Sequence, residues 1–127
     1  TWTPTITGVT TAGSYSSVSA HGTYTKVGNL VTASGSFYGA SGSGAGNMRI
    51  GGLPFSTASG NGAYLGILQG NSGITYPTGT TEAVIQLTNN TTYGEVRCNN
   101  PAGGDYSKMQ YPTTANYIRF SFSYIVS

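Results

Sequence analysis

Two glutamates are the residues of this sequence whose types and spacing could do chemistry. The pair Asn89-Asn90 predicts a two-residue turn between neighbouring strands. In that register Glu82 stands opposite Arg97, and Glu95 lies on the same side of the ribbon. The two carboxyl groups would then be about 5–9 Å apart, a separation that glycoside hydrolases use. One hypothesis is therefore a small glycan hydrolase that uses Glu82 and Glu95.

The expected neighbour of Glu82 argues against that hydrolase. A guanidinium opposite a carboxylate favours the charged form and lowers the pKa of the carboxyl group. A general acid needs the opposite, a pKa raised toward neutrality. The pattern therefore predicts a structural ion pair between Glu82 and Arg97, and we expect no catalytic residue in this chain.

The remaining reactive side chains are few. His21 has no Cys, Asp or Glu at metal-ligand spacing, and no GxSxG motif supplies a nucleophile, so we interpret it as a partly exposed turn histidine. The one cysteine, Cys98, has no partner for an intrachain disulfide and is expected to be a small buried apolar residue. With three acidic residues, we expect neither a calcium cage nor any other metal or cofactor.

The segment GASGSGAGNMR, from Gly39 to Arg49, has the glycine content of a phosphate-binding loop but not its pattern. A phosphate cradle needs GxxxxGK[ST] or GxGxxG leading into a helix. The residues that follow, IGGLPF, contain two glycines and a proline and cannot begin a helix. We therefore interpret the segment as a flexible hairpin loop between two strands.

Composition points to a single β-rich domain with an uncharged surface. Gly, Ser, Thr and Asn occupy 63 of the 127 positions, and only eight residues carry charge, so hydroxyls and amides must solvate the surface. The five basic residues are scattered and form no stripe for nucleic acid. No apolar run approaches the roughly 20 residues of a membrane span, so we expect no membrane insertion.

Hydrophobic residues alternate with a period of two along most of the chain, which indicates strands. The clearest pieces are a hairpin, His21–Val27 and Leu30–Tyr38, joined by Gly28-Asn29, and a last strand, Tyr117–Val126. Further strands are predicted at Thr1–Thr7, Asn47–Leu53, Ala63–Gln69, Ile74–Tyr76, Thr81–Thr88, Thr92–Cys98 and Tyr106–Tyr111. About ten short strands predict an all-β, antiparallel β-sandwich or jelly-roll-like domain.

Four segments, WTPT, GTYTKVGNLV, MRIGGLPF and YIRFSFSYIVS, give the chain a recognisable order. From Trp2 to Tyr124 this order resembles the C-terminal domain of phage tail fibres and tailspikes. The resemblance implies an all-β domain at the distal tip of the fibre in the virion tail, assembled as a homotrimer and contacting bacterial surface glycans or aiding assembly. It also implies that residues 1–127 form one tip domain of a longer protein made in the bacterial cytoplasm.

A receptor site, if present, is expected in the connection from Cys98 to Asn116. Polar and aromatic side chains gather there around Pro and Gly-Gly; they are Asn99, Asn100, Asp105, Tyr106, Lys108 and Tyr111. Amides and carboxylates can pair with sugar hydroxyls, a tyrosine ring can stack beneath the sugar, and Lys108 would favour an acidic sugar or a phosphate. Tyr76 also flanks a polar loop and is a further ligand candidate.

Three functions therefore stay open. The leading hypothesis is a tip domain, without catalytic activity, that adsorbs the phage to lipopolysaccharide or capsule. The alternatives are a purely structural domain that trimerises and caps the fibre, and the small hydrolase that uses Glu82 and Glu95.

Overall fold

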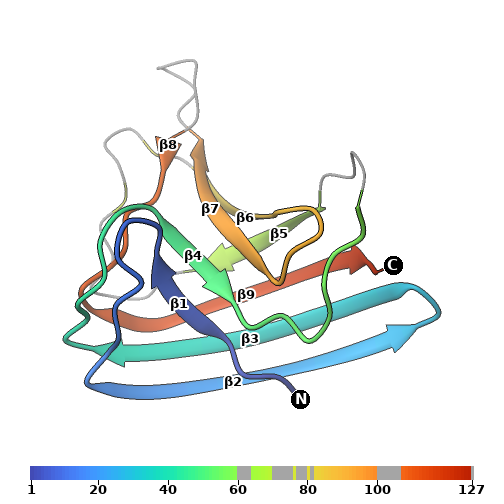
Figure 1. Cartoon of the computed structure of the whole chain (residues 1–127), viewed down its shortest axis with the longest axis horizontal. Coiled ribbons are helices and arrows are strands. Elements are labelled where there is room, and N and C mark those ends of the chain that lie inside the picture. Colours follow the sequence, from blue (N-terminus) through green and yellow to red (C-terminus); the bar gives the residue numbers. More distant parts are fainter. Residues whose placement is uncertain (60–63, 70–75, 77–79, 81, 100–106, 127) are drawn as a thin grey trace.

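The structure is a computed structural model of the 127-residue chain and describes residues 1–59, 64–69, 76, 80, 82–99 and 107–126. Every regular element within these residues is a β-strand, and every strand pair is antiparallel, so the prediction of an all-β antiparallel fold is confirmed (Figure 1). In chain order the strands are β1 (Thr5–Gly8), β2 (Ser17–Val27), β3 (Leu30–Ala40), β4 (Met48–Gly51), β5 (Tyr64–Gln69), β6 (Glu82–Leu87), β7 (Tyr93–Asn99), β8 (Ser107–Lys108) and β9 (Ala115–Ile125).

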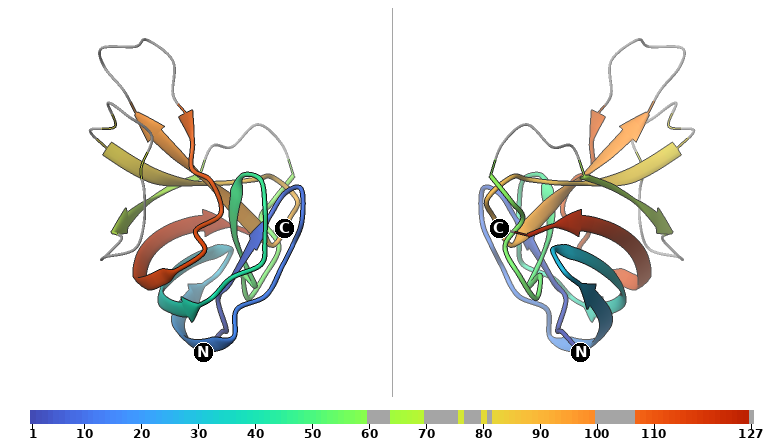
Figure 2. Two further views of the ribbon diagram at one scale, coloured as in Figure 1. Left: turned by 90° about the vertical axis from the view of Figure 1, so that its left-hand side faces the viewer. Right: turned by 90° about the vertical axis from the view of Figure 1, so that its right-hand side faces the viewer.

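These strands form one continuous sheet in the order β1-β4-β7-β6-β5-β9-β3-β2, with β8 beside β7. The sheet curls into a nearly closed, barrel-like shape rather than dividing into two separate sheets (Figure 2). Two of the expected strands are not seen as such. In Ile74–Tyr76 the first two positions lie outside the described residues and Tyr76 belongs to no strand, while of Thr1–Thr7 only the part from Thr5 onward is in β1.

The hairpin predicted around Gly28-Asn29 is confirmed, with Val27 opposite Leu30 and Gly28 at a φ of 59°. Strand β9 pairs with the other side of β3, so the longest strands lie next to one another. The alternation read from the sequence is also confirmed. Side chains pointing inward from β3 and β9 are buried, and they are Val31, Ala33, Phe37, Ile118, Phe120, Phe122 and Tyr124.

Trp2 connects the two ends of this sheet. Its backbone N–H donates to the carbonyl of Gly22 in β2 at 3.0 Å, and its indole N–H donates to the carbonyl of Thr23 at 3.1 Å. The indole lies on the core, with its centroid 5.9 Å from the rings of both Phe120 and Phe122. Because Trp2 precedes β1 at one end of the sheet and contacts β2 at the other, this bridge joins the two ends of the nearly closed sheet.

Close approach of the indole requires glycine at position 22. A Cβ there would stand 2.6 Å from Nε1 of Trp2, so a side chain would push the ring away from β2. Gly22 pairs with Gly35 of β3, and Phe120 of β9 follows in the same row. On the inner face of the sheet, a cross-strand row therefore consists of Trp2, the two glycines and Phe120.

The glycine-rich segment from Gly39 to Arg49 is not a hairpin loop, which corrects the prediction. Strands β3 and β4, which it joins, are not paired: β4 lies between β1 and β7. The rings of Tyr15 and Tyr111 lie within 3 Å of where Cβ atoms on Gly42 and Gly44 would stand. The glycines thus allow a crossing loop to pass close beneath two aromatic rings, and no helix follows for a phosphate site.

Replacing Trp2 with Ala should lower the free energy of unfolding by about 3–5 kcal/mol, because it removes a large buried side chain. Gly22→Ala should also destabilise the fold, since the indole would have to move. Thr25→Ala, exposed on β2, is the control and should change stability by no more than about 0.5 kcal/mol. Urea unfolding measures all three, and equal losses for Trp2→Ala and Thr25→Ala would contradict the closing role.

Candidate functional site

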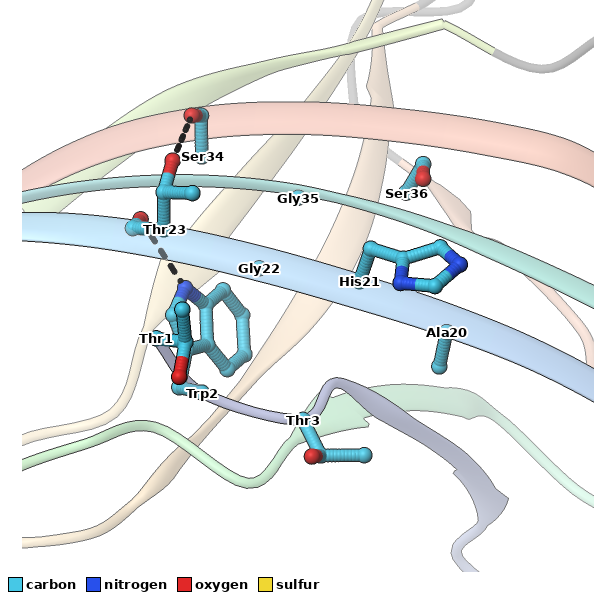
Figure 3. A pocket seen from close by; sticks show the side chains of 10 residues that line it. All are labelled: Thr1, Trp2, Thr3, Ala20, His21, Gly22, Thr23, Ser34, Gly35 and Ser36. Atoms are coloured by element: carbon cyan, nitrogen blue, oxygen red, sulfur yellow. Dashed lines mark hydrogen bonds between the residues drawn. The ribbon is translucent and has the colours of Figure 1, made fainter.

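A groove of about 520 Å³ lies where the N-terminal segment meets β2 (Figure 3). Its lining comes from the first residues of the chain and from facing parts of β2 and β3: Thr1, Trp2, Thr3, Ala20, His21, Gly22, Thr23, Ser34, Gly35 and Ser36. The volume falls within the roughly 300–1,000 Å³ typical of ligand pockets. The contact of Trp2 with β2 therefore also forms one side of this groove.

The register explains the shape of this groove. In the row of Trp2, Gly22 and Gly35 the indole points into the core and the glycines have no side chain, so backbone forms the floor. The rows on either side point outward and provide the walls. Thr23 and Ser34 stand side by side on one wall with their hydroxyl oxygens 3.3 Å apart.

The walls of the groove continue into a hydroxyl-rich surface. We call this the hydroxyl face, and it consists of the outward side chains Thr23, Thr25, Thr32, Ser34, Ser121 and Ser123 of β2, β3 and β9. Hydrogen bonds cross the strands within it, for example between Thr32 and Ser123 at 3.1 Å. Each hydroxyl can donate one hydrogen bond and accept two, which suits a ligand that itself carries many hydroxyls.

His21 stands on β2 beside the groove, and its position differs from the prediction. It lies inside β2 rather than in a turn, and it is exposed. Its ring nitrogen Nε2 lies 3.3 Å from the hydroxyl oxygen of Ser19, two residues earlier on the same face. Among the described residues no carboxylate is hydrogen-bonded to this imidazole, and no group of three metal-ligating side chains exists.

The connection expected to bind a receptor is only partly described. Asn100, Asp105 and Tyr106 lie outside the described residues. Asn99 ends β7, where its amide nitrogen donates to the Glu82 carboxylate at 3.5 Å. Lys108 belongs to the short strand β8, and its backbone pairs with Arg97. Its role in a ligand site stays a prediction.

Two of the tyrosines chosen as ligand candidates, Tyr76 and Tyr111, lie against the core. Tyr111 is 7 % exposed and stacks on Tyr15 with their ring centroids 5.2 Å apart, so its interpretation as a sugar-stacking side chain is corrected to a packing role. Burial raises the pKa of Tyr15 far above its ordinary value, so the Tyr15 hydroxyl stays uncharged. Tyr76 is half-buried and also packs against the core.

The register predicted for β6 and β7 is wrong by two residues. Glu82 stands opposite Asn99, and Arg97 stands opposite Val84. The connection is therefore a loop of four residues, Asn89 to Thr92, closed by a hydrogen bond from the N–H of Thr88 to the carbonyl of Tyr93. The predicted ion pair between Glu82 and Arg97 does not form; the carboxylate of Glu95, on Arg97's own strand, lies 3.6 Å from the guanidinium instead.

A residue distant in the sequence explains the longer loop. Thr57 is fully buried; its hydroxyl donates to the carbonyl of Thr88 at 2.6 Å and accepts from the N–H of Thr91 at 3.2 Å. Asn90 takes a positive φ of 58° within this loop, as asparagine can. A two-residue turn would leave the buried Thr57 hydroxyl without these partners, which costs about 1–3 kcal/mol.

The corrected register separates the carboxylates of the proposed hydrolase. Glu95 is opposite Gln86, whereas Glu82 is opposite Asn99, four residues farther along β7. At about 3.3 Å per residue this places them roughly 13 Å apart along the ladder. Glu95 instead lies between two guanidinium groups, 3.7 Å from Arg49 and 3.6 Å from Arg97. Glu95 is therefore the shared partner of two arginines, which is a structural arrangement.

Cys98 is confirmed as a small buried apolar residue, with no exposed surface. Burial raises the pKa of its thiol above the ordinary value, which disfavours the reactive thiolate. The interior of β7 therefore carries no nucleophile suited to catalysis.

No protein-family model, curated protein or solved structure matches this chain. None of the described residues belongs to a helix that could cross a membrane. By its fold and its surface, the chain is an antiparallel, barrel-like β-domain with a hydroxyl-lined groove.

Glu95→Gln should destabilise the protein by about 1–3 kcal/mol, because it removes the charge between two partly buried guanidinium groups. The matched control is Glu82→Gln, since Glu82 is exposed and its loss should stay within about 0.5 kcal/mol. Urea unfolding of the two variants tests the corrected register. A larger loss for Glu82→Gln than for Glu95→Gln would restore the ion pair expected from the sequence.

Proposed function

We propose that this chain is the receptor-binding tip domain of a phage tail fibre or tailspike, and that it adsorbs to a bacterial surface polysaccharide without cleaving it. The observation that carries the proposal is the groove beside the hydroxyl face, open to solvent and walled by threonine and serine. A polysaccharide presents an extended row of hydroxyls, and such a ligand is held by many weak, neutral hydrogen bonds.

The sequence motifs support the same class. YTKVGNLV forms the β2–β3 hairpin, and IGGLPF ends β4 and places Phe55 against Tyr24, with ring centroids 5.4 Å apart. Both motifs shared with tail-fibre tips therefore have structural roles in this chain. The resemblance to tail-fibre tips also implies two more specific properties. These are a jelly-roll-like arrangement of the strands and assembly as a homotrimer at the distal end of the virion tail.

A surface suited to self-association lies at one end of the β2–β3–β9 strands. Val27 is 71 % exposed, Leu30 45 % and Ile125 38 %, and the three are neighbours across the strands. We call these three residues the apolar end. An exposed apolar group of this kind is often covered by another chain. Because the apolar end is remote from the groove along the same strands, a trimer joined there would leave its grooves free.

The wild-type domain should bind at least one member of a panel of purified lipopolysaccharides and capsular polysaccharides, and should release no reducing sugar from it. The double variant Thr23→Val, Ser34→Ala removes two groove hydroxyls and should weaken binding about tenfold, because each net hydrogen bond contributes about 0.5–1.5 kcal/mol. Thr88→Val, exposed on the β6–β7 loop, is the matched control and should bind as the wild type does.

Binding to no member of the panel would favour the purely structural alternative, a domain that trimerises and caps the fibre. Sugar release by the wild type but not by Glu82→Gln would favour the hydrolase. Both measurements use the same glycans, so one set of samples separates the three hypotheses.

Light scattering at micromolar concentration should return a mass of about 39 kDa, three copies of the 13.1 kDa chain. Leu30→Asp should reduce the mass toward that of a monomer, because it places a charge in the apolar end. Thr88→Asp places the same charge on a different part of the surface and serves as the control. A wild-type mass of 13.1 kDa would contradict the trimer.

A further inference from the structure

We infer that a second binding subsite, specific for an anionic sugar residue, lies on the outer face of β3, β9 and β5 around Tyr38, Tyr117, Arg119 and Gln69. The inference rests on the proposed glycan-binding function and names the chemistry of the glycan. The anion is a carboxylated or a phosphorylated sugar, since both present paired oxygens to a guanidinium.

The first observation is a bulge in β9. Phe37 pairs with Ile118 and Gly39 pairs with Ala115, so Tyr38 is opposite two residues of β9 rather than one. At this bulge Tyr117 has a φ of 54°, in the left-handed region where glycine is normally required. Non-glycine residues with strained backbone cluster at active sites and ligand-binding sites, and bulges often re-aim a side chain beside a functional site.

The strained backbone at Tyr117 places its exposed ring beside the ring of Tyr38. Tyr117 is 47 % exposed, and its ring centroid is 5.3 Å from that of Tyr38 at an interplanar angle of 38°. Two tilted tyrosine rings at the surface offer apolar faces to a sugar and hydroxyls to its polar edge. Because the core contains neither ring, packing does not require Tyr117 to adopt this conformation.

The second observation is the charge beside these rings. Arg119 is exposed, and its guanidinium carbon lies 5.8 Å from the centroid of Tyr117. The other basic side chains that the structure describes have polar partners: Arg49 and Arg97 contact Glu95, and Lys26 donates to the carbonyl of Gly28. No carboxylate among the described residues pairs with Arg119. Its donors are therefore available to an external anion.

The third observation is a hollow beside the guanidinium. A pocket of about 210 Å³ lies between β5 and β9 and is lined by Ile67, Leu68, Gln69, Arg119, Phe120 and Ser121. It is smaller than the roughly 300–1,000 Å³ of a typical ligand pocket, so it suits a single sugar residue or its charged substituent. The exposed Gln69 is the direct cross-strand partner of Arg119 and can bind neighbouring hydroxyls through its amide.

The two subsites lie on one continuous surface. A transverse row of outward residues runs from His21 on β2 through Ser36 on β3 and Arg119 on β9 to Gln69 on β5. His21 and Ser36 also line the groove beside Trp2. A polysaccharide lying along this row would contact the hydroxyl-walled groove at one end and the guanidinium at the other.

The test measures the binding of three soluble polysaccharides to the wild-type domain: polygalacturonate, which carries carboxylates; phosphomannan, which carries phosphates; and dextran, which is neutral. The wild type should bind one of the anionic polymers at least tenfold more tightly than dextran, and the stronger of the two identifies the source of the anion. Arg119→Gln should remove most of that preference, and Arg119→Lys should restore only part of it. Lys26→Gln removes a positive charge from a different strand, β2, and should leave the preference intact.

The strained tyrosine gives an independent readout. Tyr117→Gly should lose at least tenfold in binding to the anionic polymer while its melting temperature stays at or above that of the wild type, because glycine accepts the positive φ without strain. Tyr117→Phe keeps the ring and should retain most of the binding. A merely structural Tyr117 would instead give a lower melting temperature with glycine and unchanged binding, which would overturn the inference.

The outcomes separate this inference from the proposed function. Binding to dextran as tight as to the anionic polymers, or equal losses in Arg119→Gln and Lys26→Gln, would overturn the anionic subsite alone. Binding to none of these polymers and to none of the purified bacterial glycans would overturn both.

Discussion

The contact between Trp2 and the row that crosses β2, β3 and β9 is the interaction on which the rest of the structure depends. Trp2 contributes hydrogen bonds to the edge of β2 and an indole to the aromatic core, so it joins both ends of one sheet at once. Glycine at position 22 makes this possible, since a Cβ there would stand 2.6 Å from the indole, and a Cβ at position 35 would be in tight contact with Phe120 at 3.0 Å. Apart from this bridge, β2 is an edge strand that pairs only with β3.

Closure of the sheet separates two environments. Inside, the buried side chains are almost all apolar, with Thr57 as the one buried polar residue among those described. Outside, the strands present hydroxyls in cross-strand rows, and the few described charges are distributed unevenly. Glu95 pairs with two arginines, one on β4 and one on β7, whereas Arg119 on β9 has an aromatic neighbour and no described carboxylate. The outer surface of β2, β3 and β9 is therefore the part of the molecule best suited to a polar, hydroxyl-rich ligand.

The candidate binding residues lie on strands, whereas the local sequence pattern predicted them in a loop. Sequence reasoning placed the ligand in the connection after β7, because loops carry binding groups in many proteins. Tyr111 from that connection is instead a core residue stacked on Tyr15, a neighbour nearly a hundred positions earlier in the chain. Tyr117 and Arg119 were assigned to a regular strand. The local pattern does not reveal the bulge that brings Tyr117 to Tyr38, or the pairing of β5 with β9 that brings Arg119 to Gln69.

The sequence by itself determined the class of fold, the β2–β3 hairpin and the buried faces of β3 and β9, because a period of two and a glycine turn are local properties of the chain. Only the tertiary structure decided the register of β6 against β7, the crossing path of the glycine-rich segment and the closure at Trp2. Each of these depends on a distant partner: Thr57 extends the β6–β7 loop, Tyr111 covers the glycines, and Gly22 receives the indole. These contacts stabilise the fold only when two residues far apart in the chain meet, so no local pattern of side chains could have revealed them.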